Sequence, residues 1–202
     1  MKINEYLDSF DANFCDAAIA ARKETGKALK DIVGKKYEEH RRMLWESQGF
    51  DWRRKLPKSA FTADGYIYDN NGKLLVVEEA KGHYVDSCFL ERALTGFVKQ
   101  IKAFLDDGWT EKEMPYFVLT SSATFNGYEK KFEQYIDIFL DANPLKQILR
   151  KKVRYFAVSP HDRLDRSASG HGWLQTTNRP VHRTPETKAL VKKELKFMEG
   201  LQ

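Results

Sequence analysis

Hydrophobic and polar positions follow a helical period over the first part of the chain. Residues 4–48 contain no proline, and one break is expected at Thr25-Gly26. Beyond this break, one arc of a helical wheel carries the apolar stripe of a helix that packs on a core. The members of that stripe are Ala28, Leu29, Ile32, Val33, Tyr37, Met43 and Leu44. The pattern predicts helices on both sides of the break.

Two short runs with β-like character follow, at residues 60–69 and 73–81. They are separated by Asn70-Asn71-Gly72. An Asn-Gly pair between β-branched and aromatic runs favours a tight hairpin, because both residues tolerate positive φ. We therefore predict an antiparallel pair of strands here.

The rest of the chain alternates helical and strand-like segments. The expected elements are a helix from Asp86 or Ser87 to Asp106-Asp107-Gly108, strands at 115–121 and 153–158, a helix at 128–141, and a capped basic helix from Thr184 onward. Helices alternating with strands after a hairpin predict an α/β fold with a mixed central sheet flanked by helices. Residues 159–184 are polar and show no period, which is typical of a functional loop or a disordered segment.

Composition narrows the class of protein. A chain of 202 residues with 42% hydrophobic and 13% aromatic content can bury a core, so we expect one folded domain over residues 1–202. No apolar run approaches the ~20 residues of a membrane span, and acids occur early at the N-terminus. We therefore expect a cytoplasmic protein without a membrane partner. Cys15 and Cys88 form no CxxC motif, so we interpret both as small buried apolar residues.

Basic residues are unevenly distributed. Residues 150–202 hold twelve Lys and Arg against five acids, whereas the whole chain has a net charge of only +5. A second basic cluster comprises Arg41, Arg42, Arg53, Arg54, Lys55 and Lys58. Clustered cations neutralise phosphates, which suggests a nucleic-acid partner, although a solvated surface explains charge statistics equally well.

The second strand of the hairpin carries the candidate chemistry. An apolar run ends in Glu78-Glu79-Ala80-Lys81, and the period of two puts Glu79 and Lys81 on one face and Glu78 on the other. Antiparallel pairing across the turn brings Asp64 toward Glu79. Two carboxylates beside an ammonium suit divalent-metal chemistry, whereas an exposed Glu-Lys pair of no functional importance is the alternative.

In this setting the chain resembles the PD-(D/E)XK nuclease superfamily. The resemblance rests on Thr62-Ala63-Asp64-Gly65 and Val77-Glu78-Glu79-Ala80-Lys81 within a predicted αβββαβ core at about residues 28–158. Ala63 stands where the motif name has proline. The resemblance implies a Mg²⁺-dependent phosphodiesterase, with Mn²⁺ as a substitute.

The resemblance also implies roles for individual residues. Asp64 and Glu79 would bind the metal, and Lys81 would assist the attacking water. Members of the superfamily often add a glutamate from the preceding helix. The candidate here is Glu39, on the flank of the apolar face, with Glu38 pointing further away and Glu46 equally well placed.

The small core with an added polar segment looks like a type II restriction endonuclease, an enzyme class that usually acts as a homodimer on double-stranded DNA. The candidate base-reading residues are Arg163, Arg166, Gln175, Asn178, Arg179 and Arg183. Contact of this segment with phosphate alone is the alternative. Two other functions stay open: a nuclease of repair or recombination that recognises DNA structure or ends, and a nucleic-acid-binding module without catalysis.

Other reaction classes find little support. The chain has no G-x-x-x-x-G-K-[ST] phosphate loop, no G-x-G-x-x-G, no H-E-x-x-H and no G-x-S-x-G. We therefore do not expect ATP hydrolysis, dinucleotide binding, zinc proteolysis or acyl transfer.

Overall fold

The computed structural model describes residues 1–27, 29–54, 63–85, 87–124, 134, 137–138, 144–160 and 183–202. The side chains at 29–31, 83–85, 87–89, 123–124 and 159–160 are not described. Most of the helix predicted at 128–141, and residues 161–182 of the predicted recognition segment, lie outside the described residues.

The order of elements agrees with the predicted alternation, but the short strand Asp51–Arg53 and the short helix Lys146–Lys152 were not predicted from the sequence. In chain order they are α1 (Ile3–Phe10), the π-helical segment η1 (Asp11–Asp16), α2 (Ala17–Thr25), α3 (Leu29–Ser47), β1 (Asp51–Arg53), β2 (Gly65–Tyr68), β3 (Leu74–Val85), α4 (Ser87–Asp106), β4 (Tyr116–Thr124), α6 (Lys146–Lys152), β5 (Val153–Pro160) and α8 (Pro185–Glu199). The helix–strand–strand–strand–helix–strand order expected for the core is present from α3 to β4.

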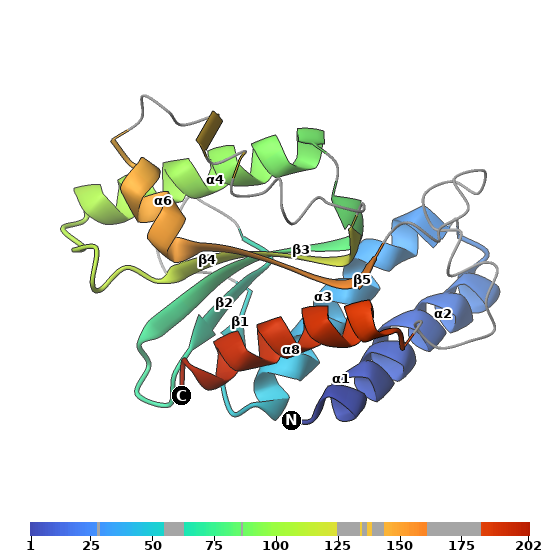
Figure 1. Ribbon diagram of the computed structural model, residues 1–202. Coiled ribbons are helices and arrows are strands. Elements are labelled where there is room, and N and C mark those ends of the chain that lie inside the picture. The colour runs from blue at the N-terminus through green and yellow to red at the C-terminus, as the bar shows by residue number, and fades with distance from the viewer. Residues whose placement is uncertain are drawn as a thin grey trace.

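The five strands form one mixed sheet in the order β1-β2-β3-β4-β5. β1, β2 and β3 pair antiparallel, whereas β3, β4 and β5 pair parallel. Figure 1 shows α1, α2, α3 and α8 on one face of the sheet and α4 with α6 on the other. The fold is therefore the predicted α/β class, with a mixed sheet between two helical layers.

Each face of the sheet has its own hydrophobic core. On one face Ile67, Val76 and Phe156 pack with the helices α1–α3 and α8. On the other, Val77 and Phe117 pack with α4. Neighbouring residues of β3 thus enter different cores, and this alternation decides where each side chain of the candidate motif points.

Local signals in the sequence account for the element ends. Gly26 has φ 65° after α2, Gly72 has φ 77° in the hairpin turn and Gly108 has φ 87° after α4, so each adopts the left-handed conformation that glycine favours. The hydroxyl of Thr184 accepts a hydrogen bond from the backbone N–H of Thr187, as expected of a helix cap. One prediction is wrong: Met43 is 43% exposed, since it lies at the edge of the apolar arc.

Every helix in the described ranges is too short or too polar to cross a membrane.

Candidate active site

Three of the predicted site residues meet where the β2–β3 ladder ends. The paired residues at that end are Gly65 and Glu78, so Asp64 and Glu79 come next on their strands. The ammonium of Lys81 lies 2.5 Å from Oε1 of Glu79 and 3.6 Å from Oδ2 of Asp64. Each of the three side chains is about one quarter exposed. The structure therefore groups the two carboxylates and the ammonium that the sequence places at this strand end.

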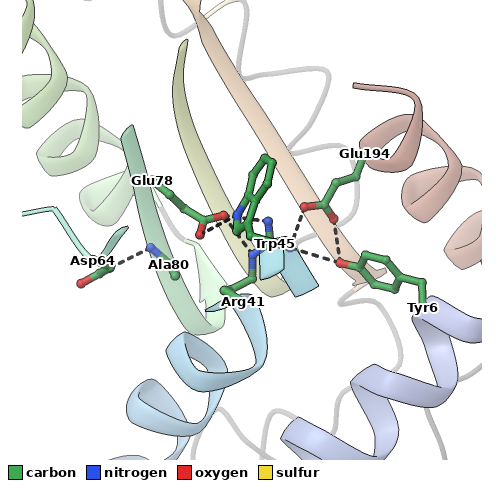
Figure 2. A network of polar contacts seen from close by, with 7 residues as sticks. All are labelled: Tyr6, Arg41, Trp45, Asp64, Glu78, Ala80 and Glu194. Atoms are coloured by element: carbon green, nitrogen blue, oxygen red, sulfur yellow. Dashed lines mark hydrogen bonds and ion pairs between the residues drawn. The ribbon is translucent and has the colours of Figure 1, made fainter. Parts of the chain in front are cut away.

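The backbone fixes the position of Asp64. Its Oδ2 accepts a hydrogen bond of 2.7 Å from the backbone N–H of Ala80, a contact drawn in Figure 2. Next to it, Trp52 packs directly on Gly65, where an added Cβ would lie 2.2 Å from the indole nitrogen. Gly65 therefore allows a close approach that a larger residue would prevent. The pairing of β3 with β4 also shifts register between Lys81 and Tyr84, so the ladder is irregular just beyond Lys81.

The charges of Asp64, Glu79 and Lys81 shift the pKa values of Glu79 and Lys81. Burial raises the pKa of Glu79, and the negative charge of Asp64 adds to this shift while Lys81 opposes it. Burial alone would lower the pKa of Lys81, but the charges of Asp64 and Glu79 outweigh it and raise that pKa. The two carboxylates therefore favour the charged form of Lys81.

The donor atoms of this site fit a hard divalent cation. One oxygen of each carboxylate is occupied, Oδ2 of Asp64 by Ala80 and Oε1 of Glu79 by Lys81. The other two oxygens, Oδ1 and Oε2, have no hydrogen-bond partner among the described residues. No group of three or more Asp, Glu, His or Cys in the described ranges is arranged to hold a metal ion. Two carboxylates suffice for Mg²⁺, which keeps several waters and takes further ligands from substrate phosphate.

One glutamate of α3, Glu38, interacts electrostatically with the site. Burial raises its pKa, and the charge of Asp64 is the next largest cause, with Lys81 and Glu79 contributing smaller effects. Its carboxylate pairs with Arg54 at 3.1 Å. Glu38 therefore belongs to the same electrostatic cluster as the strand residues.

The sequence-based preference for Glu39 differs from this arrangement. Glu39 is 51% exposed and pairs with Lys36 at 2.8 Å, and Glu46 is exposed. The expectation that Glu38 points further away is wrong, because the apolar arc of α3 marks the direction of the core, whereas the site lies at the end of the sheet. The backbones of α3 and β3 come very close nearby: a Cβ on Gly82 would lie 2.4 Å from the carbonyl oxygen of Val33.

Of the six predicted base-reading residues, the structure describes Arg183. Arg163, Arg166, Gln175, Asn178 and Arg179 lie outside the described residues. Arg183 is described, and it pairs with Asp8 at 2.5 Å and with Asp11 at 3.1 Å. Its predicted contact with DNA stays a prediction, and it would require Arg183 to exchange these partners.

A buried polar network behind the site was not expected from the sequence. Nε and Nη2 of Arg41 donate to Oε1 of Glu78 at 2.9 and 2.7 Å, and Nη1 pairs with Glu194 at 2.6 Å. Trp45 donates to the second oxygen of Glu78 at 3.1 Å, and Tyr6 donates to Glu194 at 2.7 Å. Figure 2 shows these side chains converging from α1, α3, β3 and α8.

This network corrects the assignment of Arg41 to a nucleic-acid-binding cluster. The side chains of Arg41 and Glu78 are each only 1% exposed. Burial raises the pKa of Glu78, although Arg41 opposes that shift. The signal was available: Glu78 points away from Glu79 into an apolar face, and a buried carboxylate requires a cation. The network holds β3 by the residue that immediately precedes Glu79.

Comparisons with known proteins give little further guidance. No family model matches the sequence, and no curated protein matches it either. One solved structure, a complex of the restriction endonuclease PspGI with substrate DNA, superposes with a TM-score of 0.36 and 12% sequence identity, over 70% of this chain and 67% of that chain. At that level of similarity, function must be inferred from the site itself.

Proposed function

We propose that the protein is a Mg²⁺-dependent endonuclease that hydrolyses phosphodiester bonds of double-stranded DNA, in the manner of a type II restriction enzyme. The observation that carries the proposal is the position of Lys81 between the carboxylates of Asp64 and Glu79, at 3.6 and 2.5 Å. An acidic pair with one cation is suited to a metal and a phosphate together. A surface Glu-Lys pair would need neither the partly buried setting nor Asp64.

The proposed roles follow from charge. Asp64 and Glu79 would hold Mg²⁺, with Mn²⁺ as a substitute, through the oxygens that Ala80 and Lys81 leave free. When bound, the metal would lower the pKa of a water and neutralise charge on the phosphoryl group. The ammonium of Lys81 would donate a hydrogen bond to the attacking water or to a phosphate oxygen, and so stabilise negative charge as it develops.

Glu38 is the candidate for a further polar role. Its raised pKa makes it a better proton acceptor than an exposed glutamate. The charge of Asp64 raises this pKa, and the charge of Lys81 lowers it. It could orient the attacking water from the side of α3. Glu39 serves as its natural comparison, since it neighbours Glu38 but is half exposed.

Sequence recognition is proposed to reside in residues 159–184, through Arg163, Arg166, Gln175, Asn178, Arg179 and Arg183. A homodimer is proposed as well, because cutting both strands of a palindrome requires two copies of one site. Sedimentation equilibrium, with and without DNA, measures the state of assembly directly. If the protein cleaves DNA but sediments as a monomer with DNA bound, the proposed homodimer is refuted and the catalytic proposal is not affected.

The decisive experiment is digestion of a supercoiled plasmid with and without Mg²⁺. We expect discrete fragments in Mg²⁺ or Mn²⁺ and none in a chelator. Glu79→Gln, Asp64→Asn and Lys81→Met should each slow cleavage by at least about 100-fold, because each removes one charge from the reacting centre. Glu46→Gln removes an exposed carboxylate from the same helix and is the matched control, which should cleave as the wild type does.

The products separate the candidate functions. A demand for free ends, flaps or junctions would favour a repair or recombination nuclease with the same catalytic residues. Binding that persists in a chelator without cleavage in any divalent metal would favour a non-catalytic module and would overturn the proposal. Cleavage at wild-type rate by Glu79→Gln would remove the proposed metal site.

A further inference from the structure

A pocket of about 350 Å³ opens beside the candidate site, between α3 and the strand β1. Its lining combines cations, acids and one aromatic ring: Lys35, Glu38, Glu39, Arg42, Trp52 and Arg54. Glu38 belongs both to this pocket and to the electrostatic cluster of Asp64, Glu79 and Lys81. A molecule in the pocket would therefore lie next to the proposed reaction.

The ion pairs of the pocket leave a positive excess. Glu38 pairs with Arg54 at 3.1 Å, and Glu39 pairs with Lys36, which is not part of the lining, at 2.8 Å. Lys35 and Arg42 are exposed, and neither has an acidic partner in the part of the chain that the structure describes. These two cations are thus available for an anionic ligand.

Their spacing suits a chain of phosphates. Lys35 and Arg42 are seven residues apart on α3, so they share one face and lie about 10 Å apart along the helix axis. A DNA strand carries one phosphate for each nucleotide, so two cations at this separation can contact separate phosphates of one strand.

We infer that this pocket binds the DNA backbone, with Lys35 and Arg42 contacting phosphates of the cleaved strand that neighbour the scissile one. The inference rests on the proposed function for the identity of the ligand. It assigns strand positioning to α3, apart from the base reading proposed for residues 159–184. It also replaces the buried Arg41 with Arg42 as the phosphate-binding cation of this helix.

The test measures how salt affects binding. The affinity of the full chain for a fluorescent duplex of about 30 base pairs would be followed by anisotropy in a chelator, from about 50 to 200 mM salt. Removing two phosphate contacts should reduce the slope of log K against log salt by about 1.8, so the wild type should lose about 12-fold more affinity over this range than Lys35→Ala/Arg42→Ala.

Two variants control for charge and for folding. Lys99→Ala/Lys102→Ala removes the same charge from α4, on the opposite face of the sheet, and should keep the wild-type slope. Lys35→Arg/Arg42→Lys keeps both charges and should keep the slope as well. All four substituted positions are exposed, so the variants should unfold at the wild-type temperature.

An unchanged slope in Lys35→Ala/Arg42→Ala would overturn the inference. The inference would also be overturned if millimolar free mononucleotide displaced the duplex from the wild type but not from this variant. That result would show that the pocket binds a small nucleotide instead. Plasmid digestion in parallel distinguishes the two proposals. If the wild type cleaves plasmid but Lys35→Ala/Arg42→Ala keeps the wild-type slope, only the proposed backbone contact is refuted. If that variant has a reduced slope but the wild type does not cleave, only the proposed nuclease activity is refuted.

Discussion

His40 should make the fold less stable in mild acid. Its ring is fully buried between α1 and α3, with centroids 5.3 Å from Phe10 and 6.0 Å from Tyr37. Neither ring nitrogen has a hydrogen-bond partner among the described residues. Burial, reinforced by the charge of Arg41, lowers the pKa of His40 to about 3. The folded protein therefore keeps this ring neutral.

The magnitude follows from proton linkage. Unfolded histidine titrates near pH 6.5, so between about pH 6.5 and pH 3 the unfolded state binds a proton that the folded state does not. Stability is therefore lost as the pH falls through this window. With 1.36 kcal/mol for each pKa unit, His40 should reduce the free energy of unfolding by about 2 kcal/mol between pH 8 and pH 5.

Urea unfolding followed by tryptophan fluorescence can measure this effect at both pH values. Other groups titrate too, so the quantity of interest is the difference in free energy of unfolding between His40→Leu and the wild type. It should shift by about 2 kcal/mol in favour of the variant from pH 8 to pH 5. Phe14→Leu alters the same aromatic cluster without changing a titratable group, and its difference should not shift. A pH-independent difference for His40→Leu would refute the reasoning.

Three further predictions concern the support of the site. Arg41→Met should reduce the free energy of unfolding by about 3 to 5 kcal/mol in urea titrations, because two buried carboxylates lose their cation, whereas the exposed neighbour in Arg42→Ala should change it by less than about 0.5 kcal/mol. Gly65→Ala should reduce the rate of plasmid cleavage at temperatures where the variant is still folded, since its Cβ would displace the ring of Trp52 beside Asp64. A wild-type rate would contradict this. Thr184→Ala should cost about 1 kcal/mol in the same urea titrations by removing a helix cap, and an unchanged midpoint would show that the cap is dispensable.

Local patterns predicted the frame of the molecule well. The Asn71-Gly72 turn and the alternation along β3 were sufficient to place Glu79 and Lys81 on one face, because strand parity does not depend on distant contacts. Proximity to Asp64 required only the hairpin register. These features are short-range, and the sequence specifies them directly.

Features that depend on distant partners were harder to predict. Arg41 looked like a surface cation because its partner Glu78 lies 37 positions away, and only the packed sheet brings them together. The choice between Glu38 and Glu39 depended on how α3 is rotated against the end of the sheet. A helical wheel shows the direction of the core but not the direction of a site at its rim.

The contact between Tyr6 and Glu194 has a consequence for how the protein is made. The two residues are 188 positions apart, yet both belong to the network that anchors Glu78. During synthesis on the ribosome, α1, α3 and β3 emerge long before α8. The face of the sheet on which α8 packs is therefore partly exposed to solvent until α8 emerges. Such long-range closure slows folding, and it delays the final arrangement around Glu78 until Glu194 has left the ribosome.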